Sequence, residues 1–142
     1  MRVLALDIGD ARIGIAAGDT ATRIALPVRV LPAADVLAGA RTWRDVLADE
    51  EPELLVSGLP ATLRGTSGAQ ARHVRETAAR IAEAAGLPLE FADERLSSAE
   101  AKRILREQGL SERDMRGRVD AVAASLFLET WLDRHAQAEE SG

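Results

Sequence analysis

The first thirty residues contain three apolar segments separated by turn residues, and this pattern predicts three strands. The segments 2–8, 12–18 and 23–30 are rich in Val, Ile, Leu and Ala, and each has the length of a strand. Residues 9–11, Gly-Asp-Ala, have the composition of a turn, so the first two segments should form a hairpin. Pro27 lies inside the third segment, which favours an edge strand or a bulge there.

After these segments, apolar positions with helical spacing alternate with short apolar runs. Capping boxes begin at Ser67 and Ser97, where Gln70 and Glu100 follow three residues later. We predict helices over 34–49, 67–85, 97–108 and 118–136, strands over 53–58 and 87–92, and a polar, basic loop over 110–117. This order predicts an α/β fold with a mixed five-stranded sheet and helices on both faces. The first three strands should be antiparallel and the later strands parallel.

Composition limits the classes of protein to which the chain can belong. With 142 residues, 46% of them apolar, we expect a single domain over 1–136 and an acidic, disordered tail over 137–142. The lack of cysteine excludes disulfides and thiolate sites, and two histidines argue against zinc, so any metal should be bound by oxygen. No apolar run could span a bilayer and no secretion signal is visible, so we expect a cytoplasmic protein without a membrane partner.

Three acidic residues stand where apolar segments end or begin. Asp7 closes the first strand, Glu94 follows the fifth, and Asp120 begins the last helix. Ligands collect at the carboxyl ends of parallel strands, and carboxylates from separate elements suit Mg²⁺. Two such ions can promote phosphodiester cleavage, so one interpretation is a metal-dependent nuclease. The simpler interpretation is that these acids are helix caps or ion-pair partners, which are common at element ends.

Charge is unevenly distributed along the chain. The net charge of −5 is unfavourable for non-specific nucleic-acid binding. Bases nevertheless gather around Glu94 and Asp120, and those that could guide a phosphate chain are Arg95, Arg113, Arg116 and Arg118. The alternative is that they form a solvated helix surface. The 110–117 loop has little hydrophobic anchoring, so we expect it to be mobile until substrate binds.

Several other residues have structural interpretations. Gly9 and Gly14 are expected to serve the hairpin. His73 and His135 lie in helical stretches and are expected to have surface or packing roles. Aromatic residues make up only 3% of the chain, so stacking of bases on aromatic rings is a poor candidate for substrate recognition. Recognition of backbone and shape is the better expectation.

Four motifs, taken in order, resemble those of the RNase H-like superfamily and, within it, the YqgF/RuvX family. They are Leu6-Asp7-Ile8-Gly9 with Arg12-Ile13-Gly14, Val56-Ser57-Gly58-Leu59-Pro60 with Gly65-Thr66, Asp93-Glu94-Arg95-Leu96-Ser97-Ser98, and Val119-Asp120-Ala121-Val122-Ala123-Ala124. Each motif alone is weak, but together they extend over nearly the whole chain. The sequence departs from the family at Asp10-Ala11, where members usually have a threonine or similar residue and then a basic residue. That departure concerns one phosphate contact rather than the fold.

The resemblance implies a nuclease that matures the 5′ end of pre-16S ribosomal RNA, or a Holliday junction resolvase that acts on branched DNA. Carried over to this sequence, it implies that Asp7, Glu94 and Asp120 are catalytic acids that bind Mg²⁺ or Mn²⁺ in a two-metal site. Asp93 is an alternative to Glu94, although neighbours on a strand point to opposite sides.

The same resemblance bears on substrate contacts and partners. Arg12 and Arg95 flank the acids and would either contact the scissile phosphate or form ion pairs with the carboxylates. We expect pre-rRNA as the favoured partner, with branched DNA as an alternative and a ribosome-assembly or transcription factor as a helper. The protein should be a monomer or a weak homodimer.

Two other classes of function stay open. An Asp-x-Gly turn between strands also opens the ATPase domain of actin-like sugar kinases, but those proteins need a second such domain and this chain is short. The other class is an RNase H-like module that holds RNA or a protein partner without cutting. The acid triad argues against that class, and the negative net charge indicates weak intrinsic RNA binding that needs help from a partner.

Overall fold

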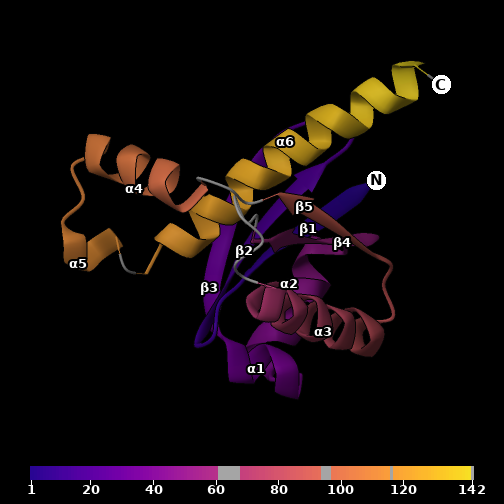
Figure 1. Ribbon diagram of the computed structural model, residues 1–142, viewed down its shortest axis with the longest axis horizontal. Coiled ribbons are helices and arrows are strands. Elements are labelled where there is room, and N and C mark those ends of the chain that lie inside the picture. The colour runs from indigo at the N-terminus through magenta and orange to yellow at the C-terminus, as the bar shows by residue number, and fades with distance from the viewer. Residues whose placement is uncertain (61–67, 94–96, 116, 142) are drawn as a thin grey trace.

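Five strands form one sheet with helices on both sides of it (Figure 1). The computed structural model describes residues 1–60, 68–93, 97–115 and 117–141. The elements in chain order are β1 (Arg2–Ile8), β2 (Arg12–Asp19), β3 (Ala25–Pro32), α1 (Ala33–Ala38), α2 (Arg41–Glu50), β4 (Leu54–Leu59), α3 (Gly68–Ala85), β5 (Leu89–Asp93), α4 (Ser97–Glu107), α5 (Glu112–Met115) and α6 (Val119–Ser141). Within these described ranges, no helix is both long and apolar enough to cross a membrane.

The strands lie in the order β3-β2-β1-β4-β5. β2 is antiparallel to both β1 and β3, whereas β4 is parallel to both β1 and β5. The predicted mixed sheet is therefore confirmed. β3 is an edge strand, and its register with β2 shifts between Ile15 and Ala16, opposite Pro27. The expected place of this proline, at an edge with a bulge, is confirmed as well.

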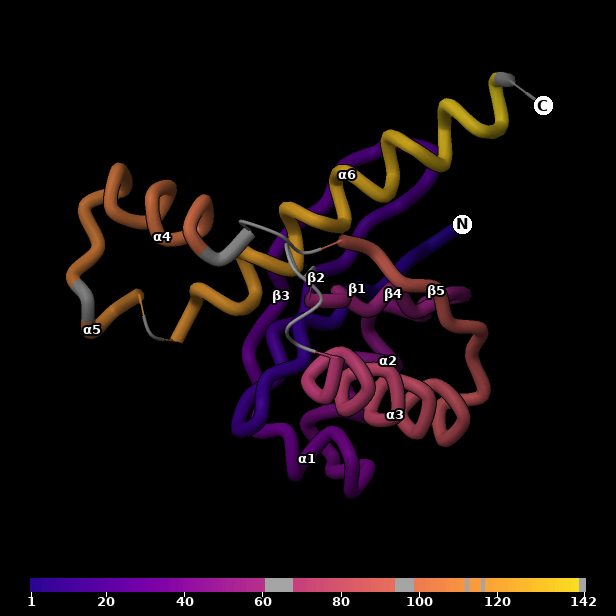
Figure 2. The backbone as a smooth tube through the Cα atoms, in the orientation of Figure 1, coloured from indigo at the N-terminus to yellow at the C-terminus, as the bar shows by residue number. Residues whose placement is uncertain are grey.

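Side chains along β1 alternate between two cores, one on each face of the sheet. Leu4 and Leu6 belong to the core shared with α1, α2 and α3, while Val3 and Ala5 belong to the core built with α6. Figure 2 shows α3 on one side of the sheet and α6 crossing the other side. Asp7 continues the row of Val3 and Ala5, so its carboxylate belongs to the α6 face.

The single helix predicted over 34–49 is wrong, because two helices, α1 and α2, occupy this segment. Gly39 adopts a left-handed conformation with φ of 66°, and its N–H donates to the carbonyls of Asp35 and Val36, which closes α1. Val36 and Trp43 are both buried on the same side of the sheet, so their helical spacing continues across the break. Periodicity alone therefore predicted one continuous helix.

The unanchored loop predicted over 110–117 is also wrong, because this segment contains the short helix α5. The N–H of Asp114 donates to the hydroxyl of Ser111 at 3.2 Å, as in a helix cap. Met115 is only 3% exposed and gives the segment a hydrophobic anchor. A four-residue helix is too short to produce a periodic apolar pattern.

The last helix, predicted to end near residue 136, continues as α6 to Ser141. This stretch contains Ala, Gln and Glu, which favour helix, and neither Gly nor Pro interrupts it. Arg23, between β2 and β3, forms an ion pair with Glu140 at 3.1 Å. The acidic residues thus extend a helix that crosses the sheet.

Candidate functional site

Asp7 lies near the end of β1, directly opposite Gly14 of β2 in the sheet register. The Asp7 side chain is partly buried, and its row on β1 faces α6. Gly14 belongs to the same face of β2, because the next residue in its row, Ala16, packs in the α6 core. The carboxylate therefore lies beside a position that has no side chain.

Gly14 allows the first turn of α6 to approach the sheet very closely. A Cβ atom added at Gly14 would lie 2.2 Å from the carbonyl carbon and oxygen of Asp120, and 2.6 Å from the nitrogen of Ala121. Only glycine permits such an approach of helix backbone to strand backbone. Asp7 and Asp120 therefore flank the same glycine, Asp7 from the neighbouring strand and Asp120 from the helix above. We call Asp7, Gly14 and Asp120 the acidic corner.

The two glycines of the hairpin region have different roles. The N–H of Gly9 donates to the carbonyl of Arg12 at 2.9 Å and closes the hairpin, as expected. Gly14 lies within β2 and serves the contact with α6 rather than the turn. The expectation that Gly14 serves the hairpin is therefore wrong, because a sequence does not reveal which residue lies above a strand.

Arg12, the first residue of β2, forms an ion pair with Asp120. Its Nε lies 3.3 Å from Oδ2 of Asp120, and the two side chains are 56% and 27% exposed. Ion pairing was one of the two alternatives for Arg12, and it is present here. The contact joins the end of the hairpin turn to the first turn of α6.

The fifth strand carries the remaining acid candidates. Glu94 and Arg95 lie outside the described residues, so the gathering of three carboxylates stays a prediction. Asp93 ends β5 and pairs in register with Leu59, which packs against the core on the α3 side. The preceding residue, Ala92, packs against the α6 core instead. Strand alternation alone places Asp93 on the α3 face, but as the last residue of β5 it also lines the groove beside α6, and its role as a metal ligand stays a prediction.

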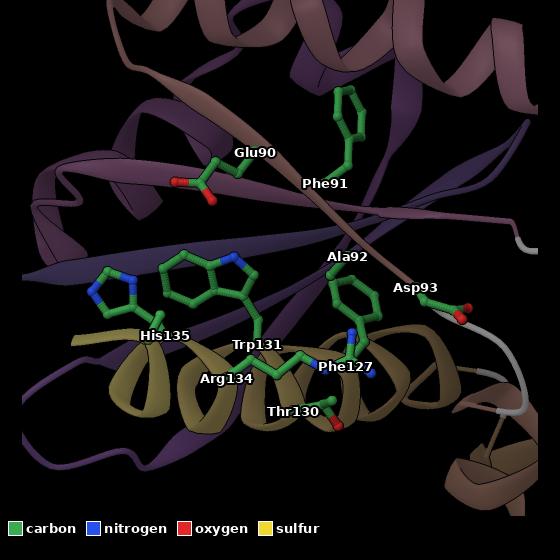
Figure 3. Close-up of a pocket in the computed structure, with 10 residues that line it drawn as sticks. Glu90, Phe91, Ala92, Asp93, Phe127, Thr130, Trp131, Arg134 and His135 are labelled. Carbon is green, nitrogen blue, oxygen red and sulfur yellow. The ribbon is translucent and has the colours of Figure 1, made fainter. Parts of the chain in front are cut away.

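A groove of about 520 Å³ lies between β5 and α6 (Figure 3). The polar side chains that line it are Glu90, Asp93, Thr130, Arg134 and His135. In Figure 3, Ala92 points across the groove toward Phe127, whereas Phe91 points away from it. The rings of Trp131 and His135 stack with centroids 4.9 Å apart, and Trp131 is 9% exposed. Because this indole is buried, it offers little surface on which a base could stack.

The predicted basic rim is spread over different elements. Arg118 directly precedes α6, whereas Arg113 lies on α5, and both are exposed. Figure 1 shows α4 and α5 extending to the side of α6, away from the sheet. Arg118 also lines an apolar cavity of about 440 Å³ between β3, α4 and α6, together with Arg29. Arg116 lies outside the described residues, and substrate contact by these arginines stays a prediction.

One polar contact beside the hairpin was not foreseen. Nε2 of His73 on α3 lies 3.8 Å from Oδ1 of Asp10 in the turn, and the side chains are 55% and 99% exposed. Pairs this exposed contribute little to stability. The two residues are far apart in the sequence, which contains no signal that would have brought them together.

The chemistry of the acidic corner suits a hard divalent cation. Asp7 and Asp120 offer carboxylate oxygens from two separate elements, which is the donor type that Mg²⁺ and Mn²⁺ prefer. Within the described part of the chain, no group of three His, Cys, Asp or Glu residues could hold a metal ion. The third candidate, Glu94, lies outside that part. The described acids thus fit part of such a ligand set.

Solved structures with a similar fold include Holliday junction resolvases. The structure of Thermus thermophilus RuvC in complex with a Holliday junction substrate matches with a TM-score of 0.58, covers 96% of both chains and is 15% identical. The yeast mitochondrial Holliday junction resolvase Ydc2 matches with a TM-score of 0.52, covers 97% of this chain and 80% of its own, and is 10% identical. The fold is therefore the RNase H fold in its RuvC-like form.

Sequence comparison narrows this class to one family. The family described as "RuvX: Holliday junction resolvase" matches residues 1–134. The "Putative pre-16S rRNA nuclease" of Anaeromyxobacter sp. (strain Fw109-5) is 47% identical over 96% of this chain and 100% of that protein. The protein of the same name from Acaryochloris marina (strain MBIC 11017) is 39% identical over 92% of this chain and 91% of that protein. The chain belongs to the RuvX family, which confirms the resemblance drawn from the motifs.

Proposed function

We propose that this protein is a divalent-metal-dependent endonuclease that hydrolyses phosphodiester bonds during maturation of the 5′ end of pre-16S rRNA. The observation that carries the proposal is the acidic corner, in which Asp7 and Asp120 flank Gly14 on the α6 face of the sheet. Membership in a family of nucleases and resolvases supports hydrolysis of nucleic acid as the reaction class.

The chain's own residues would divide the work as follows. Asp7 and Asp120, with Glu94 as the third acid, would hold two Mg²⁺ or Mn²⁺ ions at the corner. Divalent ions in such a site supply an activated water and neutralise the leaving oxygen. Arg12 lies at the rim of the corner and would contact a phosphate of the substrate. The groove between β5 and α6 would receive the chain that continues from the scissile bond.

The choice of RNA over DNA rests on the name of the relatives, "Putative pre-16S rRNA nuclease". Branched DNA is the second candidate, favoured by the description of the family and by the similarity of the fold to RuvC. A net charge of −5 gives weak general attraction to either polymer. A ribosome-assembly or transcription partner in the cytoplasm would compensate for this by delivering the RNA.

Cleavage of defined substrates tests the proposal. A pre-16S rRNA leader, a single-stranded RNA and a four-way DNA junction are incubated with the protein and Mg²⁺ or Mn²⁺. We expect cleavage of the leader that disappears when the metal is chelated. Preferential cleavage of the junction would favour resolvase activity. Stable binding without cleavage of any substrate would favour a binding module.

The variant Asp7→Asn assigns the activity to the corner. It keeps the shape of the side chain but removes its charge, so we expect cleavage to fall by roughly 100-fold or more, since a metal ligand is lost. The fold should survive, as checked by circular dichroism. Asp49→Asn is the matched control, because Asp49 is exposed on α2, across the sheet from the corner. If Asp7→Asn cuts as fast as the control, the activity belongs to another site or to a contaminant.

A further inference from the structure

Arg12 contacts a carboxylate oxygen of Asp120 to which a divalent cation at the acidic corner would bind. The two side chains approach at Nε of Arg12 and Oδ2 of Asp120, 3.3 Å apart, which is longer than the roughly 2.7–2.9 Å typical of a strong charge-assisted hydrogen bond. The Arg12 side chain is 56% exposed, so it can leave Asp120 without opening the core. The ion pair therefore has the features of an exchangeable contact.

Asp120 does not need Arg12 to hold its position. The backbone of Asp120 is fixed by its close contact with Gly14, where a Cβ atom would lie only 2.2 Å away. The side chain is attached to this fixed backbone, in the first turn of α6. Because Arg12 is not needed to position Asp120, its role there is electrostatic: it balances the negative charge of the Asp120 carboxylate.

A positive charge beside a metal ligand opposes the binding of a divalent cation. The guanidinium group neutralises Asp120 and repels any second cation at short range. Phosphate oxygens offer arginine a better, bidentate partner. A nucleic-acid phosphate at the corner would therefore draw Arg12 away from Asp120 and lower the barrier to metal binding.

We propose that Arg12 exchanges partners. It neutralises Asp120 while the corner holds no cation, and it moves to a substrate phosphate when cation and nucleic acid bind. Metal and nucleic acid then strengthen each other's binding, and the strengthening is reciprocal. This inference rests on the proposed function, because it takes the corner to be the metal site of a nuclease.

Mn²⁺ binding, measured by calorimetry without cleavage, tests the exchange. For Arg12→Gln in the absence of nucleic acid, we expect Mn²⁺ to bind roughly three- to tenfold more tightly than to the wild type, because the competing charge is gone. A phosphorothioate oligonucleotide that resists cleavage should tighten Mn²⁺ binding to the wild type by a similar factor. In Arg12→Gln the oligonucleotide should have a much smaller effect.

Arg23→Gln is the matched control. Arg23 is 49% exposed and is paired with Glu140 at the far end of α6, so it resembles Arg12 in exposure and partner but is remote from the corner. Its Mn²⁺ affinity should equal that of the wild type. An unchanged or weaker Mn²⁺ affinity in Arg12→Gln would overturn the exchange.

Asp7→Asn separates this inference from the proposed function. If it abolishes Mn²⁺ binding, the ion binds at the corner, and the affinity of Arg12→Gln decides on the exchange alone. If Asp7→Asn binds Mn²⁺ as well as the wild type, or the wild type binds none, the metal site of the proposed function is wrong and the exchange falls with it. Thermal melting of each variant confirms that the fold is retained.

Discussion

The acidic corner and the arm formed by α4 and α5 are built in different ways. At the corner, strand backbone meets helix backbone with no side chain between them, next to a buried core. In the arm, α4 packs mainly against α6, and its exposed face carries ion pairs between Arg103, Glu100 and Glu107. The comparison teaches that groups requiring fixed separations are positioned by backbone contacts, whereas Arg113, which is expected to meet a flexible polymer, lies on a peripheral helix.

Replacing one glycine by alanine at the corner and one beside the arm should give the largest difference in stability between the two regions. Gly14→Ala forces a Cβ against the backbone of Asp120, so α6 must shift, and we expect a loss of about 3 kcal/mol in the free energy of unfolding. Gly117→Ala, beside the arm, has nothing within 4 Å of its new Cβ and should stay within about 0.5 kcal/mol of the wild type. Urea denaturation measures both. Equal stabilities would mean that the close approach of α6 to β2 does not exist.

Removing the anchor of the arm should have a smaller, local effect. Met115 is 3% exposed on α5, and Met115→Ala removes buried apolar surface, at a cost of about 2 kcal/mol. The arm extends to the side of α6, away from the sheet, so it can open without unfolding the sheet. In Met115→Ala we therefore expect amide hydrogen exchange in α4 and α5 to be faster than in the wild type. Exchange in β1 and β4 should change little. Equal acceleration in those strands would show that arm and sheet unfold as one unit.

Arg113 and Arg116 are expected to affect substrate binding without affecting the fold. Arg113→Ala combined with Arg116→Ala should weaken RNA binding and flatten its salt dependence, with the slope falling by about 0.7 for each lost phosphate contact on a single strand. Filter binding at several salt concentrations measures this. Asp7→Asn at the corner serves as the reference, because it should leave the salt slope unchanged. If the double variant keeps both affinity and slope, these arginines are a solvated surface.

The pH dependence of stability at acid pH should show the smallest difference, here between the sheet and the arm. The N–H of Ala21 donates to Asp19 and lowers the pKa of that carboxyl, and Arg103 lowers the pKa of Glu100 on the arm. A lowered pKa in the folded state gives stability that is present above the ordinary pKa of about 4 and lost as pH falls through the folded value.

The two carboxyls should be separable by mutation. Asp19→Asn should slightly flatten the acid side of the global stability curve, because Asp19 ends β2 in the sheet. Glu100→Gln should alter only hydrogen exchange in the arm. Global stability measured by urea denaturation from neutral to acid pH distinguishes them. An equal effect of both variants on that curve would contradict the separation of sheet and arm.

The sheet could be predicted because its signals are local. Short apolar runs, the turn at 9–11 and Pro27 are readable in the sequence, and their order leaves few topologies. The break at Gly39 and the helix α5 were missed because a single left-handed residue and a four-residue helix barely disturb hydrophobic periodicity.

The acids Asp7 and Asp120 could be proposed from their places at element ends, but their arrangement could not. The contact between Gly14 and Asp120, and the choice of Arg12 between phosphate and carboxylate, depend on how α6 crosses β2. That crossing is set by packing between residues distant in the chain, such as Ala16 and Phe127 in the α6 core. No local pattern encodes such a distance.

The edge strand β3 has a consequence for colloidal behaviour. Leu26 is 62% exposed and Ile24, just before the strand, is 58% exposed, so an apolar strip lies at an open edge of the sheet. Such an edge invites strands of other molecules to add to it. Pro27 has no N–H to donate, and the bulge next to it, at Val28 of the same strand, bends the strand. The protein can therefore keep an apolar strand at its surface without offering a regular template on which fibrils could grow.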